Sequence, residues 1–233
     1  MAERIAVVDY GMGNLHSVSK AIECASWPSF FRWMYWVRWL RWVRSLLGLP
    51  RVEVTSDPDR VASADRVIFP GQGAMPDCMR EMDARGLRDA VLESARTKPF
   101  LGICIGLQML FDRSEEGGVD GLAVFPGEVR RFPKSAMVDS NGQKLTVPHI
   151  GWNRVKQGEH PLWSGVEDGS RFYFVHSYFP EVREAGLVQG TTEYGIPFTC
   201  AVARDNIFAV QFHPEKSDTA GLRLLANFLN WNP

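Results

Sequence analysis

This chain of 233 residues has no paired cysteines, little net charge and no nucleotide-binding or metal-binding motif. Its four cysteines are scattered and none lies in a paired CxxC spacing, which argues against a zinc site or a disulfide framework. Its formal net charge is only -1 at pH 7, so nucleic acid and anionic membranes are not expected as main partners. It contains no P-loop and no metal-ligand spacing, so no nucleotide, metal or other cofactor is expected. The scattered, unpaired cysteines fit a reducing cytoplasm best.

Size and composition predict one folded domain over residues 1–233. The chain is 45% hydrophobic, which is enough for one substantial core. No internal repeat or Ser/Gly-rich linker divides it. Its first residues include Glu3 and Asp9 and only a short apolar run, so they predict a first strand rather than a signal peptide.

The order of predicted elements indicates an α/β fold with a central, mostly parallel sheet flanked by helices. In the first half, short apolar runs alternate with glycine-rich turns and helix-forming stretches, as is typical of parallel sheets. After Gly117 the runs shorten and alternate in polarity, which predicts additional mixed or antiparallel strands in the C-terminal half. We predict strands at 5–8, 52–55, 67–69, 100–103, 128–132, 152–155, 171–175, 199–203 and 208–211, and helices at 15–23, 58–64, 87–96 and 218–230.

The most informative stretch is LGICIGLQML, residues 101–110. Gly102 and Gly106 flank Cys104 in the small-x-nucleophile-x-small pattern of a nucleophile elbow, where glycines let the chain turn sharply from a strand into a helix. A thiol at a helix N-terminus gains thiolate character. The alternative is a buried cysteine in a tight turn.

A second motif, AVQFHPEKS at residues 209–217, ends an apolar strand. His213 and Glu215 are two residues apart, so in an extended chain they point the same way. A histidine can take the thiol proton and later protonate a leaving amine, while a carboxylate orients its ring. Taken alone, His213 fits a satisfied strand-end histidine and Glu215 a solvated charge.

Together these motifs resemble the class I glutamine amidotransferases, and the resemblance implies the fold of that family. By this resemblance Cys104 is the nucleophile, His213 the general acid and base, and Glu215 its orienting carboxylate. The implied reaction is hydrolysis of glutamine to glutamate and ammonia through a cysteine thioester. The resemblance covers almost the whole chain except residues 24–50.

Oxyanion donors are predicted at two places. Ile105 N–H follows the nucleophile, and the PGQGAM strip at 70–75, the oxyanion loop in the family, brings Gly71 and Gly73 close to a ligand. An ordinary tight turn is the alternative for this strip. The resemblance also implies a set of residues that contact glutamine: Gln108, His176, Ser177 and Tyr178.

Three further stretches resemble the glutaminase subunits of imidazole glycerol phosphate synthases, which act in histidine biosynthesis. They are VVDYGMGNLHSV at 7–18, PHIGWN at 148–153 and FYFVHSYF at 172–179. The implied partner is a (β/α)8-barrel cyclase that forms a heterodimer with the chain. It receives the ammonia and yields imidazole glycerol phosphate and an aminoimidazole carboxamide ribonucleotide. The resemblance also implies that Lys216 lies near the partner interface. The alternative is that Lys216 is an ordinary solvated charge.

Residues 24–50 interrupt the family pattern. This block holds five of the eight tryptophans, four arginines and no acidic residue. Its spacing predicts a basic amphipathic helix with Arg38, Arg41 and Arg44 opposite a tryptophan-rich face. A membrane-surface or docking role is one interpretation. We favour an insertion without function, because it interrupts an otherwise complete enzyme pattern.

Three alternatives to this function stay open at the level of sequence. The chain could serve another synthase, such as one for anthranilate or guanylate. It could be a catalytically silent subunit that only stabilises a partner. It could also be a membrane-surface binding protein built around residues 24–50.

Overall fold

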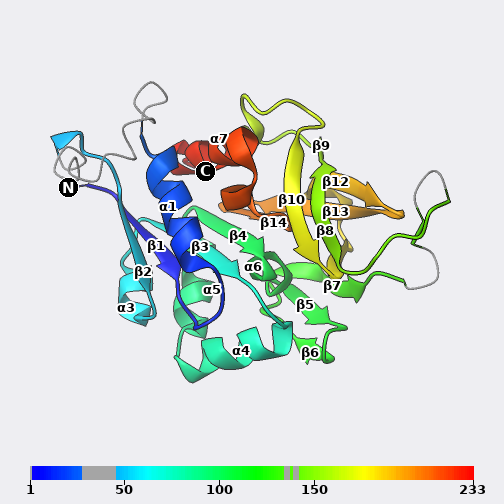
Figure 1. Ribbon diagram of the computed structural model, residues 1–233. Coiled ribbons are helices and arrows are strands. Elements are labelled where there is room, and N and C mark those ends of the chain that lie inside the picture. The colour runs from blue at the N-terminus through cyan, green and yellow to red at the C-terminus, as the bar shows by residue number, and fades with distance from the viewer. Residues whose placement is uncertain (1, 28–45, 134–136, 139–141) are drawn as a thin grey trace.

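The computed structural model describes residues 2–27, 46–133, 137–138 and 142–233. Most of the segment 24–50, including its predicted amphipathic helix, lies outside the described residues. Within them the largest sheet has eight strands in the order β2-β1-β3-β4-β14-β13-β12-β9, and the pairs from β2 through β14 are parallel (Figure 1). The parallel strands are β1 (Arg4–Val8), β2 (Arg51–Thr55), β3 (Arg66–Gly71), β4 (Phe100–Cys104) and β14 (Ile207–Val210).

Helices cover this parallel part on both sides (Figure 1). One pair in contact is α1 (Leu15–Ala25) and α7 (Asp218–Asn230), and another is α3 (Pro58–Ala62) and α5 (Arg88–Thr97). The predicted closing helix at 218–230 is confirmed, with the same bounds. Its buried Leu224, Leu225 and Phe228 recur at helical spacing. A helix that the sequence pattern did not predict, α4 (Met75–Ala84), follows the PGQGAM strip.

The C-terminal half adds antiparallel strands, as predicted. β13 (Ile196–Arg204), β12 (Val188–Tyr194) and β9 (Lys156–Gln157) extend the large sheet. β8 (His149–Arg154) pairs with β10 (Arg171–His176) as a two-stranded sheet. The remaining sheet contains β5 (Phe111–Ser114), β6 (Val119–Asp120), β7 (Phe125–Arg131) and β11 (Tyr178–Val182). Short 3₁₀ turns lie at Pro161–Trp163, Ala185–Leu187 and Pro214–Lys216.

The core runs along the parallel strands. Every residue of β3, β4 and β14 is buried, as expected for strands covered on both faces. The carboxyl ends of β4 and β14 therefore meet at one edge of this core, and the two predicted catalytic motifs follow directly from them.

Candidate active site

Cys104 lies at a sharp turn between β4 and the helix α6 (Ile105–Gln108). Its backbone has φ 56° and ψ -110°, a conformation that is strained for a residue with a side chain. Such strain at a strand-to-helix turn is the mark of a nucleophile elbow. The helix has a single turn, because the chain enters β5 at Phe111. A dipole from so short a helix contributes little to the thiol.

The glycines of the elbow are required by close packing. A Cβ on Gly106 would lie 1.8 Å from the carbonyl oxygen of Phe69 in β3. A Cβ on Gly102 would lie 2.9 Å from the Cβ of Ala209 in β14. Both glycines therefore allow neighbouring strands to close around the turn that carries Cys104.

His213 and Glu215 form a buried pair beside this elbow. Nδ1 of His213 lies 2.8 Å from Oε1 of Glu215, and their side chains are 2% and 1% exposed. The two side chains meet across a 3₁₀ turn at Pro214–Lys216, so the expectation of an extended chain here is wrong. In an extended strand, residues two apart are separated by about 7 Å, and the tighter turn removes that gap.

Ser217 holds the backbone of His213. Its Oγ donates to the His213 carbonyl oxygen at 2.6 Å and accepts from the N–H of Tyr173 at 2.9 Å. The N–H of His213 also donates to the Tyr173 carbonyl at 2.9 Å. The backbone that carries the imidazole is thus fixed to β10.

The charge on His213 is set by its neighbours. Burial by itself lowers the pKa of His213, but the charge and side-chain interaction of Cys104, followed by those of Glu215, raise that pKa to about 10. His213 therefore holds a proton more strongly than an ordinary histidine. Its Nε2 is buried and has no hydrogen-bond partner of full geometry, which leaves a proton available for a ligand.

The predicted oxyanion strip begins next to the elbow. Gly71 pairs with Cys104 in the register of β3 and β4, and a Cβ on Gly71 would lie 3.2 Å from the Cβ of Ile105. The same Cβ would lie 1.8 Å from Oη of Tyr10, which is fully buried beneath the strip. Gly73, farther along the 70–75 strip, has φ +107° and faces the side chain of Met12.

The predicted glutamine-binding residues form a connected group. Nε2 of Gln108 donates to the carbonyl oxygen of Tyr178 at 3.1 Å, and Nδ1 of His176 lies 2.7 Å from the same oxygen. The Ser177 carbonyl accepts from Phe132 N–H at 3.1 Å. Gln108 and His176 therefore shape the turn at 176–178 with their side chains.

A hydrogen-bonded pair of histidines, His176 and His149, supports the turn at 176–178. A carbonyl only accepts, so His176 donates through Nδ1 to Tyr178, and its Nε2 accepts from Nδ1 of His149 at 3.1 Å. The ring of His149 stacks on Tyr194 with centroids 4.0 Å apart. Burial lowers the pKa of His149 to about 4 and that of His176 to about 3, so both rings are neutral.

We expect the free energy of unfolding to fall as the pH is lowered from about 6.5 towards 4. Burial also lowers the pKa of His160 to about 4, below its ordinary 6.5, so the unfolded chain takes up a proton there that the folded chain does not. Urea unfolding at pH 7 and pH 4.5 measures the loss. A His160→Gln variant should lose less stability than the unchanged chain over this interval, and equal losses would contradict the effect.

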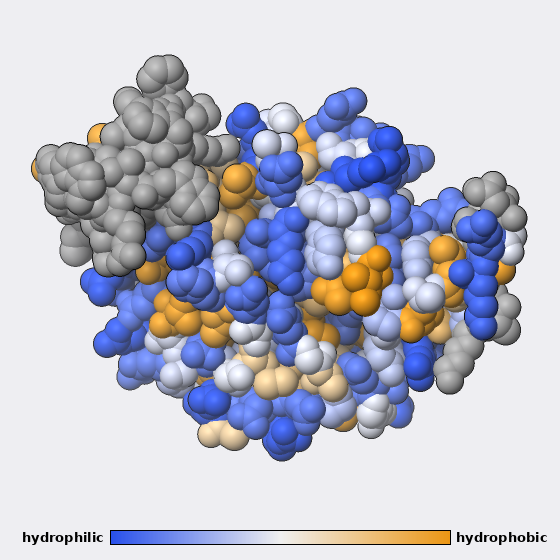
Figure 2. Space-filling view, viewed as in Figure 1, coloured by the Kyte–Doolittle hydropathy of each residue, from blue (hydrophilic) through white to orange (hydrophobic). Residues whose placement is uncertain are grey.

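Lys216 lies outside the cluster around Cys104, on an open face. Its Nζ lies 5.8 Å from the ring centroid of Tyr173, and Trp152 packs edge-on against the same ring with centroids 6.1 Å apart. Trp152 is 48% exposed and Ile150 on the same strand is 59% exposed. Figure 2 shows apolar atoms gathered over the region of β8 and β10.

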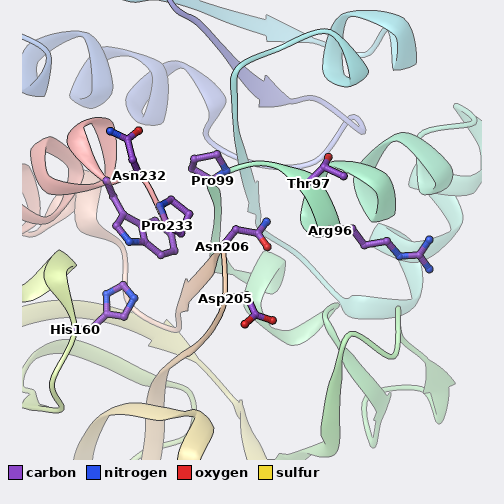
Figure 3. A pocket seen from close by; sticks show the side chains of 9 residues that line it. Arg96, Thr97, Pro99, His160, Asp205, Asn206, Asn232 and Pro233 are labelled. Atoms are coloured by element: carbon purple, nitrogen blue, oxygen red, sulfur yellow. The ribbon is translucent and has the colours of Figure 1, made fainter.

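A surface hollow of about 650 Å³ lies at the opposite end of the sheet (Figure 3). It adjoins the amino ends of β4 and β14, and none of the predicted site residues lines it. One of its polar side chains, Asn206, already donates to the carbonyls of Ala95 and Lys98. Its lining comprises Arg96, Thr97, Pro99, His160, Asp205, Asn206, Trp231, Asn232 and Pro233.

Sequence reasoning missed one polar residue that touches Cys104. Nε2 of Gln211 lies 3.8 Å from the Cys104 sulfur. The available signal was a glutamine inside an apolar strand, two residues before His213 and hence on the same face. Among the described residues no group of three or more His, Cys, Asp or Glu is arranged to hold a metal ion. No helix in the described ranges is long and apolar enough to cross a membrane.

The sequence is similar to those of known proteins. Residues 50–231 match the family described as glutamine amidotransferase class-I. The imidazole glycerol phosphate synthase subunit HisH of Dechloromonas aromatica is 59% identical over 231 residues, covering 99% of this chain and 98% of the relative. The protein of the same name from Thiobacillus denitrificans is also 59% identical, covering 100% of this chain and 93% of the relative.

A similar fold occurs among solved structures. A putative GMP synthase protein from Thermoplasma acidophilum superposes with a TM-score of 0.64 at 15% identity, covering 99% of this chain and 94% of the other. At that identity the likeness concerns the fold alone.

Proposed function

Because the chain belongs to the class I glutamine amidotransferases, and among them to the HisH subunits of imidazole glycerol phosphate synthase, we propose that Cys104, His213 and Glu215 hydrolyse glutamine. The chain is the glutaminase subunit of this synthase, an enzyme of histidine biosynthesis. The observation that carries the catalytic assignment is the strained Cys104 beside a buried pair of His213 and Glu215.

The reaction begins at the sulfur. The raised pKa of His213 makes its imidazole a strong base, which takes the thiol proton of Cys104 and leaves a thiolate. The thiolate attacks the side-chain amide carbon of glutamine, and the electron pair of the C=O bond moves to the oxygen. Main-chain N–H groups of Gly71, Gly73 and Ile105 stabilise this oxyanion.

Collapse of that intermediate releases ammonia. The C–N bond breaks, and the nitrogen leaves with the proton that Nε2 of His213 carries. Glu215 keeps the ring oriented through its hydrogen bond to Nδ1. A water then gives a proton to His213 and attacks the thioester, which frees glutamate and restores the Cys104 thiolate. Neither a metal nor an organic cofactor enters this cycle.

Glutamine is held by the group around the turn at 176–178. Gln108 uses Nε2 within the fold, while its Oε1 is buried without a partner. Gln108 therefore accepts a hydrogen bond from a donor on the substrate. Backbone and side-chain groups of His176, Ser177 and Tyr178 complete this subsite.

The chain works as one subunit of a synthase whose other subunit is a cyclase. In our proposal the cyclase is a (β/α)8 barrel that forms a heterodimer with the chain in the cytoplasm. It docks on the open face with Ile150, Trp152 and Lys216, because exposed apolar and aromatic side chains are typical of interfaces. The whole chain, residues 1–233, acts as one glutamine amidotransferase domain.

The alternatives raised by the sequence differ in support. Relatives of the same name at 59%, 59% and 57% identity favour this synthase over those for anthranilate or guanylate. A catalytically silent subunit has no need of the buried His213–Glu215 pair. A membrane-surface role depends on a helix that lies outside the described residues, so the enzyme remains our proposal.

We expect the isolated chain to be a poor glutaminase that the liganded cyclase stimulates at least about fivefold, the lower range of measured couplings between sites. The glycines of the 70–75 strip allow its peptide planes to turn, so a partner can select the state with N–H groups pointing inward. Glutamate release is measured for the isolated chain, with the cyclase, and with the cyclase and its nucleotide ligand.

Two surface variants sharpen this test. Trp152→Ala removes an aromatic group from the proposed interface and should reduce the stimulation. Val54→Ala, on the far-edge strand β2 and 40% exposed, should leave the stimulation unchanged. Equal turnover by the liganded complex and the free chain would show that the strip is already productive.

A further inference from the structure

Gln211 is a buried polar residue for which the proposed mechanism has no role. It follows β14 directly, is fully buried, and its N–H donates to the Cys200 carbonyl at 2.8 Å. Its side chain bridges Gln108 and Cys104. A buried amide is expected where its hydrogen bonds are needed, because burying it without them is costly.

The hydrogen bonds determine which end of each amide faces Cys104. The Tyr178 carbonyl only accepts, so the group of Gln108 that faces it is the NH2. The second proton on that nitrogen points to Gln211 at 3.0 Å, so the facing atom of Gln211 is its oxygen, Oε1. The NH2 of Gln211 is therefore the group that faces the Cys104 sulfur at 3.8 Å.

We infer that Gln211 is a positioning residue for the nucleophile, which donates a hydrogen bond to the Cys104 thiolate in an orientation fixed by Gln108 and the Tyr178 carbonyl. This inference rests on the proposed function, in which Cys104 attacks as an anion. An amide N–H stabilises the anion without protonating it, so the sulfur keeps the electron pair that it uses for attack. His213, two residues further along the same motif, remains free to deliver its proton to nitrogen.

The arrangement also links substrate binding to the nucleophile. Gln108 is at once a substrate contact and the residue that orients Gln211. A substrate donor that binds Oε1 of Gln108 thereby reinforces the bond between Gln108 and Gln211, as neighbouring hydrogen bonds polarise one another. The nucleophile and the binding site are thus aligned by two successive side-chain hydrogen bonds, from Gln108 to Gln211 and from Gln211 to Cys104.

A Gln211→Glu variant tests this role, because it keeps the shape and the acceptor towards Gln108 but replaces the donor towards sulfur by a negative oxygen. We expect Cys104 to be alkylated by iodoacetamide at pH 7 about tenfold or more slowly than in the unchanged chain, the size of effect given by a hydrogen bond to a charged group. The pH profile of alkylation should move to higher pH. Mass spectrometry of the Cys104 peptide separates this thiol from the others.

The controls separate a structural effect from the proposed one. Gln157→Glu on β9 makes the same chemical change away from Cys104 and should leave the alkylation rate unchanged. Gln211→Met removes the donor without adding a charge, and it serves if Gln211→Glu does not fold by urea denaturation. Unchanged alkylation and pH profile in a folded Gln211 variant would overturn the inference. Glutaminase activity that survives Cys104→Ala would instead overturn the proposed function.

Discussion

A Cys104→Ala variant should release glutamate from glutamine at least about 10³-fold more slowly than the unchanged chain, since removing a covalent nucleophile commonly costs this much or more. The complex with the cyclase should still form product from free ammonium, because only the source of nitrogen is lost. Both rates are measured on the same purified complex, with glutamine or an ammonium salt as the nitrogen donor. Activity with ammonium serves as the check that the variant is folded and bound.

A second thiol provides the matched control for this substitution. Cys78 is fully buried, and burial raises its pKa to about 11, so it stays protonated and has no place in the mechanism. Cys78→Ala should therefore keep most of its glutaminase activity. A Cys104→Ala protein with substantial glutamate production would end the thioester mechanism.

Gly106→Ala should destabilise the fold by about 3 kcal/mol or more, near the upper end for substitutions that overfill a core. The added Cβ would lie 1.8 Å from the Phe69 carbonyl oxygen, which belongs to the backbone of a central strand and cannot move aside cheaply. Either β3 shifts or the elbow opens, and both displace Cys104. Chemical unfolding measures the stability, and glutamate release should fall with it.

Gly186→Ala makes the same chemical change at a harmless position. Nothing lies within 4 Å of a Cβ built there, in the 3₁₀ turn at Ala185–Leu187. We expect less than about 0.5 kcal/mol of change, as is usual at surfaces. If Gly106→Ala and Gly186→Ala unfold at the same denaturant concentration, the close contact between α6 and β3 is not needed.

The parts of the site that sequence could predict are those with strong local constraints. The glycines that flank Cys104 predict the elbow, because only glycine fits a turn packed against β3 and β14. The fully apolar run of β14 is followed within three residues by His213, which places this histidine just beyond a strand end. Alternating apolar runs likewise predict the parallel sheet, since each must be buried on both faces.

Other features depend on contacts between distant segments, which no local pattern contains. The bridge from Gln211 to Gln108 joins residues 103 positions apart, and the neutral pair of His149 and His176 joins two strands of a separate sheet. The sequence pattern suggested an extended chain after His213, whereas the structure has a 3₁₀ turn at Pro214–Lys216. This turn is favoured because Ser217 and Tyr173 both hold His213. Tertiary contacts override local pattern at such places.

The pairing of β14 with β4 also determines when in biosynthesis the chemistry first becomes available. Cys104 is synthesised with β4, whereas its acid and base partner His213 is synthesised only after β14. A nascent chain that ends before residue 207 therefore carries the thiol without the imidazole. It also leaves one edge of β4 open, and an open apolar edge invites pairing with other chains until the final strand covers it. Synthesis of β14 thus covers that edge and brings the His213 motif to Cys104 in the same step.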